Sequence, residues 1–378
     1  MNFSSLDSFL ESAFGNDSNN PGCDIMIQQD DRTVYRKQFG YSSIQNRTPV
    51  NGTEHYRLYS CTKLLTVVGA LRLVESKLLS MDAPVSDYIP AFKKAFLQKN
   101  GITTSDIPTM TVRHLFTMTA GFDYQMDKPP LVKLFSGNRK VSLHEFADAS
   151  IQSPLLFAPG ERFQYSICHD ILGAVVEQVA ECSFSEYLYQ SVFAPLEMGA
   201  TKFRSSVVND KKLSSIYRYR KKENDIVCAD AEPDPLQGNR FESGGAGVIS
   251  SVEDYGKFAG ALANNGLAKN GYRLLKSETV QLMRSDQLHT ITKNATFSCS
   301  SGAGYSYGLG VRTLIDRSQG QKSPFGEFGW DGAAGSYVMI DSDNRLSVFL
   351  ATHLLNWPAR LGIPYATVRD LTYDALNR

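Results

Sequence analysis

Long apolar segments are missing from this sequence. No run reaches the about eighteen apolar residues that cross a bilayer, so we predict no membrane-spanning helix and no membrane partner. The first residues, Met1 to Ser5, contain no basic side chain, and acidic residues follow at Asp7 and Glu11. A secretory signal peptide begins instead with a basic region and an apolar core. We therefore expect a cytoplasmic protein.

An excess of charge of either sign is also missing. Thirty-nine basic residues balance thirty-nine acidic ones, which gives no electrostatic reason to expect binding to nucleic acid or to an anionic membrane. Tyr and Arg alternate in residues 216–220, and a polar turn separates them from an apolar stretch at 226–228. This arrangement predicts a solvated β-hairpin rather than a surface on which bases stack.

Cysteine and histidine are scarce and scattered. The chain has six of each, and no two cysteines have the Cys-x-x-Cys spacing. In a long chain without a recognisable export signal, free thiols are expected rather than disulfides. The cysteines and histidines also lack the spacing of metal ligands. We therefore predict neither a metal nor a cofactor.

Strand patterns lie near both ends of the chain, and helical patterns fill the middle. Strands are predicted at residues 24–27, 33–39, 307–314, 336–340 and 346–352. Helices are predicted at residues 6–14 (capped by Ser5), 112–118, 143–150, 171–180, 252–264 and 365–376. We therefore predict an α/β fold, an antiparallel sheet flanked by helices, formed by residues 1–84 and 240–378. Residues 85–239 would form an inserted, mostly α-helical domain, with the functional site in the cleft between the two.

The most informative stretch is the start of the helix predicted after Tyr56. Ser60 stands three residues before Lys63, and this is the only Ser-x-x-Lys in the chain. Apolar residues follow at the three- and four-residue spacing of a buried helix face. On a helix this spacing places the hydroxyl and the amine on one face. The simplest interpretation is a serine that caps the helix; the alternative is a nucleophile beside its base.

A serine hydroxyl attacks a carbonyl at neutral pH only if another group removes its proton. One group of serine hydrolases uses lysine for this purpose without histidine. The apolar residues after Lys63 would supply the dry surroundings in which an amine can stay neutral for part of the time. A second acid/base group is then needed to pass the proton to the leaving group.

Several further blocks make the chain resemble a known family, the serine β-lactamases and penicillin-binding proteins, and most closely its class C-like branch of carboxylesterases. The nucleophile helix of that family is similar to residues 56–85 of this chain. Further similar blocks, in the same order, are residues 116–122, 159–166, 195–198 and 243–250. The resemblance covers roughly residues 30 to 355 and favours the nucleophile over the helix cap.

The resemblance implies roles for two residues near the middle of the chain. Tyr165 matches the tyrosine that shares a proton with the lysine and delivers it to the leaving group. Ile167 stands where many members have asparagine, and is expected to contact substrate. This difference argues against a site that grips a β-lactam or a peptide amide.

The third motif of the family is often Lys-Thr-Gly, and here the matching place holds Trp330-Asp331-Gly332. The loss of the lysine removes a cation that would attract a substrate carboxylate, while Trp330 offers an apolar wall. Gly332 would let the backbone approach the substrate. By resemblance, the Ala333 N–H joins the Ser60 N–H in an oxyanion hole.

Three other features of the sequence have simpler structural interpretations. Residues 304–308 match Gly-x-Ser-x-Gly, but a nucleophile elbow needs a helix after the serine, and a strand-like stretch follows here. Cys168, His169 and Asp170 are adjacent, so their side chains diverge, and Asp170 is predicted to cap the helix at 171–180. Cys61 lies about 100° around the helix from Ser60 and is predicted to face the core.

The resemblance therefore implies a serine hydrolase that forms an acyl-enzyme at Ser60 and hydrolyses carboxylic esters of short to medium acyl chains. The alternatives are β-lactamase or D-alanyl peptidase activity, or a penicillin-binding sensor that is acylated without turnover. The partner would be a small ester or a β-lactam-like molecule, and the protein a monomer or a weak homo-oligomer.

Overall fold

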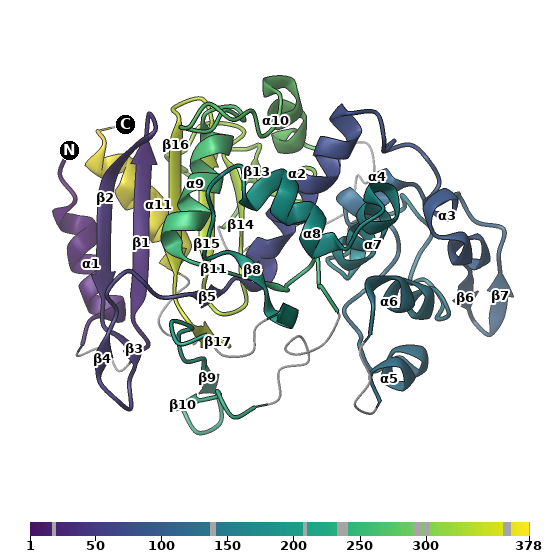
Figure 1. The fold of residues 1–378 in the computed structure, drawn as a ribbon, viewed down its shortest axis with the longest axis horizontal. Helices are drawn as coiled ribbons and strands as arrows, with labels where there is room; N and C mark the ends of the chain where they lie inside the picture. The colour runs from purple at the N-terminus through teal and green to yellow at the C-terminus, as the bar shows by residue number, and fades with distance from the viewer. Residues whose placement is uncertain are drawn as a thin grey trace.

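The computed structural model describes residues 1–16, 20–136, 141–206, 210–232, 241–289, 297, 299, 302–357 and 364–377. Strands from the two ends of the chain lie together, and most of the helices between them pack to one side (Figure 1). The predicted boundary between residues 239 and 240 lies outside the described residues. The proposed division into two domains therefore stays a prediction.

A seven-stranded antiparallel sheet joins the two ends of the chain. Its strand order is β12-β13-β14-β15-β16-β1-β2, so the N-terminal hairpin extends a sheet made mostly by C-terminal strands. The strands are β1 (Cys23–Gln29), β2 (Arg32–Phe39), β12 (Tyr305–Tyr307), β13 (Arg312–Leu314), β14 (Phe328–Asp331), β15 (Tyr337–Asp341) and β16 (Leu346–Ala351). The predicted strands at residues 24–27 and 33–39 pair antiparallel as β1–β2, and those at 336–340 and 346–352 pair antiparallel as β15–β16.

The single strand predicted at residues 307–314 is wrong. A turn at residues 308–311 divides it, so that β12 and β13 pair antiparallel with Tyr307 opposite Arg312. Gly310, with φ of +73°, adopts the left-handed backbone that favours glycine. Ser306 lies inside β12 and not at a strand-to-helix turn, so the Gly-x-Ser-x-Gly motif is no nucleophile elbow.

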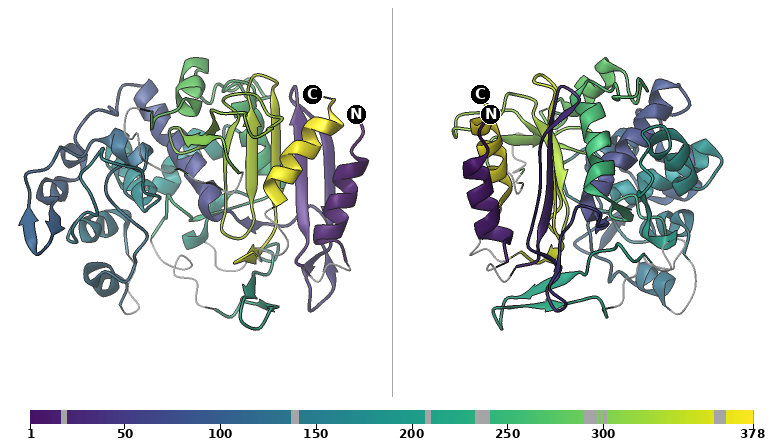
Figure 2. Two further views of the ribbon diagram at one scale, coloured as in Figure 1. Left: turned by 180° about the vertical axis from the view of Figure 1, so that it is seen from behind. Right: turned by 60° about the vertical axis from the view of Figure 1, so that its left-hand side comes forward.

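Helices cover both faces of the sheet, which explains why its strands other than the edge strand β2 are mostly buried on both sides. Helices α1 (Ser4–Phe14) and α11 (Pro364–Ala375) lie on one face, and α9 (Val252–Ala263) lies on the other (Figure 2). Ile25 and Ile27 pack on the α1 side, whereas Met26 between them packs on the opposite side, as the alternation of a strand requires. Helix α1 has no side-chain cap, so the prediction that Ser5 caps it is wrong.

The remaining elements surround this layered part. The helices are α3 (Val85–Tyr88), α4 (Val112–Phe116), α5 (Pro129–Phe135), α6 (Leu143–Ser150), α7 (Cys168–Ala180), α8 (Phe184–Leu188) and α10 (Ser277–Arg284). The short strands are β3 (Tyr41–Ser43), β4 (Thr48–Pro49), β5 (Tyr56–Arg57), β6 (Leu97–Lys99), β7 (Ile102–Thr104), β8 (Lys202–Phe203), β9 (Tyr217–Arg220), β10 (Asp225–Cys228), β11 (Val248–Ser250) and β17 (Leu354–Leu355). The predicted helices near α4, α6, α7, α9 and α11 and the β9–β10 hairpin are confirmed.

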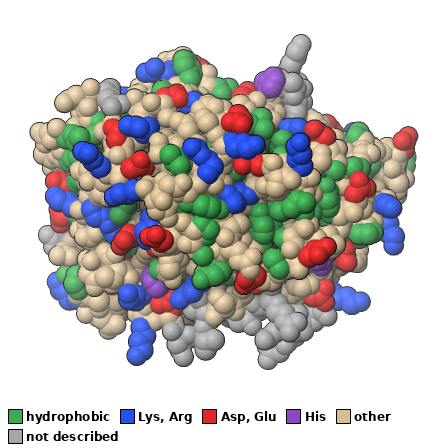
Figure 3. Space-filling model, turned by 45° about the horizontal axis from the view of Figure 1, so that its top comes forward, with side chains coloured by type: hydrophobic (Ala, Val, Ile, Leu, Met, Phe, Trp, Pro, Cys, Tyr) green, Lys and Arg blue, Asp and Glu red, His purple; other side chains and the backbone are tan. Residues whose placement is uncertain are grey.

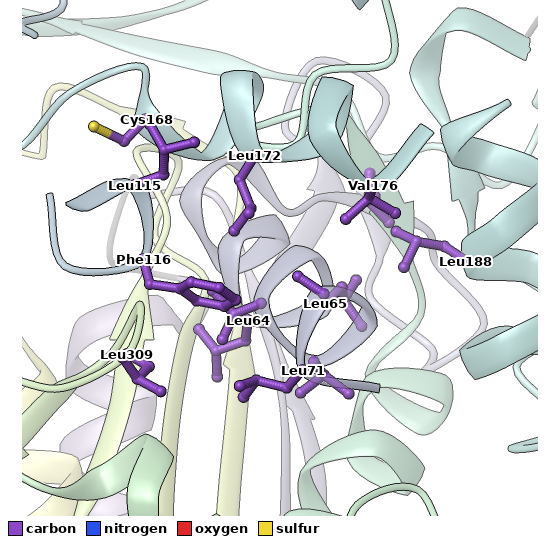
Figure 4. Close-up of a cluster of buried hydrophobic side chains, with 14 of the residues drawn as sticks. Leu64, Leu65, Leu71, Leu115, Phe116, Cys168, Leu172, Val176, Leu188 and Leu309 are labelled. Carbon is purple, nitrogen blue, oxygen red and sulfur yellow. The ribbon is translucent and has the colours of Figure 1, made fainter. Parts of the chain in front are cut away.

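Helix α2 (Thr62–Glu75) occupies the centre of the molecule. The sequence predicted one buried face, but every residue from Thr62 to Leu71 is buried, because the helix lies between the sheet and the helical part. Leu65 belongs, with Leu172 and Val176 of α7, to one cluster of buried apolar side chains (Figure 4). A fully buried leucine contributes about 2 kcal/mol of transfer free energy. These contacts hold the first turn of α2 in a fixed place.

The exterior carries both signs of charge. On the face drawn in Figure 3, basic and acidic side chains are interspersed, in keeping with the equal numbers of the two in the sequence. Within the described ranges, no helix has the length and apolar character needed to cross a bilayer.

Candidate active site

Ser60 and Lys63 meet at the start of α2. Ser60 lies in the short 3-10 helix η1 (Tyr59–Cys61), which runs directly into α2. The Lys63 Nζ donates hydrogen bonds to Ser60 Oγ at 3.1 Å and to the Gly245 carbonyl at 2.7 Å. Lys63 has 0% of its surface exposed. Helix α2 has no side-chain cap, so Ser60 does not serve as the cap that the sequence alone allowed.

The residue before the serine has an unusual backbone. Tyr59 has φ of +45°, the left-handed region that costs a residue with a side chain about 1 to 2 kcal/mol. The Arg204 guanidinium lies over the Tyr59 ring, 5.0 Å from its centroid. Such conformations persist where the surroundings enforce them, often at functional sites. Here the positive φ of Tyr59 sets the direction in which the next side chain, that of Ser60, points.

A loop from a distant part of the sequence supplies the carbonyl that holds Lys63. Strand β11 pairs with β5, and this brings residues 243–247 beside the first turns of α2. The Thr66 hydroxyl donates to the Gly244 carbonyl at 2.7 Å, and the Val248 N–H donates to Thr62 Oγ1 at 3.1 Å. The Gly245 carbonyl is therefore fixed with respect to α2.

Tyr165 and Trp330 close the other side of the pair. The Trp330 Nε1–H donates to the Tyr165 hydroxyl at 3.1 Å, and the Lys63 Nζ lies 4.8 Å from the centroid of the Tyr165 ring. A second tyrosine, Tyr124, has its ring centroid 5.4 Å from the same nitrogen. The amine thus faces two aromatic rings. The predicted proton transfer between Tyr165 and Lys63 stays a prediction.

The turn after β14 lies against the backbone next to Ser60. A Cβ on Gly332 would stand 2.2 Å from the Leu58 carbonyl oxygen and 2.2 Å from Ser336 Oγ. Glycine is therefore required for the approach of this turn to Leu58 and Ser336, and the predicted approach of the Gly332 backbone to substrate stays a prediction. Ser336 Oγ donates to the Leu58 carbonyl at 2.8 Å. An oxyanion donor must have a free N–H. The Ala333 N–H makes no hydrogen bond to any described residue.

A pocket of about 320 Å³ opens at this point. Its lining residues are Ser60, Phe163, Tyr165, Cys299, Trp330, Asp331 and Ala333. The structure therefore brings together the predicted Ser60, Tyr165, Trp330 and Ala333. Lys63 lies behind the serine. Ile167 does not join this lining: its side chain is buried in the core, 5% exposed, at the start of α7.

Phe163, Asp331 and Gly245 are among the residues of this site that had no role in the sequence prediction. Phe163 lies two positions before Tyr165, the spacing at which side chains of an extended segment share a side, so it could have been found. Asp331 follows Trp330 directly. Gly245 contributes only a carbonyl oxygen, and two adjacent glycines in the loop were its one signal in the sequence.

The predicted helix cap at Asp170 is wrong. Helix α7 begins at Cys168, two residues earlier, so that Asp170 lies inside its first turn. Its carboxylate accepts hydrogen bonds from Ser243 Oγ at 2.5 Å and from the Gly245 N–H at 3.0 Å. Burial raises the pKa of Asp170, while these hydrogen bonds and the charge of Lys63 act in the opposite direction.

The neighbouring side chains take no part in the pocket. His169 is fully buried, and burial together with the positive charge of Lys63 lowers its pKa to about 3, so it is neutral. Cys61 is buried, as predicted, and burial raises the pKa of its thiol to about 12. Across the described ranges, no cysteine forms a disulfide and no three His, Cys, Asp or Glu side chains are grouped to hold a metal ion.

Comparison with known proteins places this geometry in a family. The sequence model of the Beta-lactamase family matches residues 10–370. The protein Rv1367c of Mycobacterium tuberculosis is 26% identical over 349 residues, which cover 88% of this chain and 86% of that protein.

Two solved structures show a similar fold. EstCE1, described as a hydrolase with promiscuous acyltransferase activity, has a TM-score of 0.79 at 24% identity, covering 97% of each chain. The LovD6 mutant of simvastatin synthase from Aspergillus terreus has a TM-score of 0.80 at 21% identity, covering 99% of this chain and 95% of that one. At these identities the likeness establishes the fold. Since the family model covers nearly the whole sequence, the chain belongs to the beta-lactamase family of serine hydrolases.

Proposed function

We propose that this protein hydrolyses carboxylic esters of short to medium acyl chains through an acyl-enzyme on Ser60. The observation that carries the proposal is the 3.1 Å contact between Ser60 Oγ and the fully buried Lys63 amine at the base of an aromatic pocket. This distance is within the range for proton transfer from a nucleophile to its base.

In the first half-reaction, the Ser60 oxygen bonds to the ester carbonyl carbon and its proton passes to the Lys63 Nζ. The Ala333 and Ser60 N–H groups receive the negative charge that develops on the carbonyl oxygen. The Tyr165 hydroxyl, oriented by Trp330, passes a proton to the leaving alcohol as the C–O bond breaks. Water then attacks the acyl-enzyme with the same groups acting in reverse, and the carboxylic acid leaves.

The lining of the pocket supports neutral esters over carboxylate-bearing substrates. Phe163, Tyr165 and Trp330 present aromatic surface, and the one acidic side chain is Asp331. Within the described lining there is no Lys or Arg to receive a substrate carboxylate, which β-lactams and D-alanyl peptides carry. A cavity of about 320 Å³ is at the small end of ligand sites, which favours short acyl chains.

The same acyl-enzyme can transfer its acyl group to an alcohol in place of water. EstCE1 is described as a hydrolase with promiscuous acyltransferase activity, which supports acyl transfer as a second outcome of the proposed chemistry. Formation of a butyl ester when butanol is added to the hydrolysis reaction would reveal it.

A substrate panel tests the proposed class. With p-nitrophenyl acetate, butyrate, octanoate and palmitate, we expect kcat/KM to be highest for acetate to octanoate and to fall for palmitate. Nitrocefin, which carries a carboxylate, is expected to react at least ~10-fold more slowly than the best ester, because one lost charge contact is worth about that factor. The Ser60→Ala variant supplies the background rate. Nitrocefin turnover well above that of the short esters would reverse the assignment.

A further inference from the structure

Asp170 is a buried carboxylate that the proposed mechanism leaves unused. It is 4% exposed, and it forms no ion pair within 4.0 Å among the described residues. Two other buried carboxylates have such partners: Asp24 pairs with Arg36, and Glu327 pairs with Arg312. Asp341 is also buried and, like Asp170, is held by hydrogen bonds instead. Burial of a charge without compensation is costly, so the surroundings of Asp170 must stabilise it in another way.

The adjacent histidine does not provide that compensation. His169 is neutral, since burial and the charge of Lys63 lower its pKa to about 3. The cation that acts on Asp170 is Lys63, whose charge lowers the carboxyl pKa against the effect of burial. Lys63 is itself fully buried. The two buried groups are thus each other's electrostatic partners, with a single residue between them.

That residue is Gly245, which contacts both groups. Its N–H donates to Asp170 Oδ1 at 3.0 Å, and its carbonyl accepts from the Lys63 Nζ at 2.7 Å. Ser243 Oγ donates to the same carboxylate oxygen. The carboxylate therefore fixes both ends of the short loop whose carbonyl holds the amine.

The two glycines of the loop are explained by this contact. A Cβ on Gly245 would lie 2.7 Å from Asp170 Oδ2, and a Cβ on Gly244 would lie 2.3 Å from the His169 carbonyl oxygen. Any side chain at these positions would push the loop away from the first turn of α7. The glycines at positions 244 and 245 therefore both permit the close approach of the loop to the first turn of α7.

We propose that Asp170 is the positioning residue of Lys63: it orients the Gly245 carbonyl toward the amine and places a fixed negative charge beside it. This inference rests on the proposed function, in which Lys63 is the base. A base must be neutral to accept the Ser60 proton, and a nearby negative charge favours the protonated amine. We therefore expect removal of the Asp170 charge to change the pH dependence of turnover, through the Gly245 link to the amine.

Other titratable groups face the same amine. They are Cys61 behind the serine, Tyr124 and Tyr165 over the amine, Cys168 and His169 on α7, and Asp331 at the pocket. The two thiols have pKa values raised by burial to about 12 and His169 is neutral, so none of these three changes charge near neutral pH. Asp331 is unchanged in every variant proposed below, so it cannot cause a difference between their pH profiles.

The test is the pH profile of kcat/KM for p-nitrophenyl butyrate. Asp170→Asn keeps an oxygen that can accept from Ser243 and Gly245 but removes the charge. We expect its acid limb to move to lower pH by about half to one unit, with less than ~10-fold change at the plateau. Ser243→Ala keeps the charge and should leave the limb in place. Asp148→Asn, on the exposed side of α6, removes one distant charge and should match the wild type.

Thermal unfolding of each variant shows that it is folded. Should Asp170→Asn fail to fold, Gly245→Ala displaces the carboxylate instead, and its acid limb is expected to move in the same direction. An unmoved limb in the folded Asp170→Asn variant, with Ser60-dependent wild-type activity, overturns this inference and leaves the proposed function standing. Wild-type activity that survives Ser60→Ala overturns the proposed function itself.

Discussion

Replacement of Ser60 by alanine is expected to lower ester turnover by at least ~10⁴-fold, the order seen when a serine hydrolase loses its nucleophile. The loss corresponds to about 5 kcal/mol of transition-state stabilisation. The fold should persist, because Ser60 provides no helix cap and the one described hydrogen bond of its side chain is the contact with Lys63. The measurement is kcat for p-nitrophenyl butyrate, together with the thermal midpoint of unfolding.

Ser76 offers a matched control at the other end of α2. Its hydroxyl donates only to the carbonyls of Arg72 and Leu73 in the last turn of the helix. Ser76→Ala should therefore turn over ester at the wild-type rate. Near-normal activity in Ser60→Ala would show that Ser60 is not the nucleophile, whatever the control shows.

Replacement of Lys63 by methionine should reduce kcat by ~10³-fold or more, within the range for loss of a general base. Methionine nearly fills the same buried space but can neither accept the Ser60 proton nor donate to the Gly245 carbonyl. We expect the acylation step to be the one that slows, so the p-nitrophenolate burst should disappear together with steady-state turnover.

Lys257 on α9 is the corresponding control for the loss of a lysine. It pairs with Asp254 and donates to the Glu197 carbonyl, and it does not line the pocket that contains Ser60. Lys257→Met should keep wild-type kcat. Comparable activity in Lys63→Met and Lys257→Met would mean that another group accepts the proton.

Local spacing was enough to find the parts of the site that lie within a few residues of each other. Ser60 and Lys63 are one helical turn apart, so the sequence alone placed the hydroxyl beside the amine. Tyr165 and Trp330 are far away in the chain, and nothing local brings them to Ser60. They were found through the resemblance to a family, and the structure places both at the same pocket.

Contacts made by backbone atoms were beyond the sequence prediction. The Gly245 carbonyl reaches Lys63 because β5 pairs with β11, a long-range pairing of short strands with weak patterns. Asp170 was assigned to a helix cap because aspartate favours that place, but two donors on a distant loop compete for its carboxylate. The motif predicts that Ile167 contacts substrate. The structure places it before the first residue of α7 with its side chain 5% exposed, and contact with substrate stays a prediction.

In the fold, too, features set by local sequence were predicted, and features set by contacts between distant segments were not. Hairpins with alternating apolar residues and the helices α6 and α9 were predicted near their true bounds, because each is specified by its own residues. The two predicted caps, Ser5 and Asp170, were wrong. The burial of α2 on all sides and the turn that separates β12 from β13 depend on neighbours that no local pattern reveals. Tertiary packing decided both.

The central claim is that an acyl group is transiently attached to Ser60. A rapid acid-quench series of the wild type with p-nitrophenyl butyrate, followed by intact-protein and peptide mass spectra, tests it most directly. We predict one added butyryl group that maps to the peptide containing Ser60, appears during turnover, disappears once substrate is exhausted, and is absent from Ser60→Ala. Turnover without an adduct at any time, or an adduct on another residue, would contradict the acyl-enzyme mechanism, and an adduct that persists without product release would contradict hydrolysis.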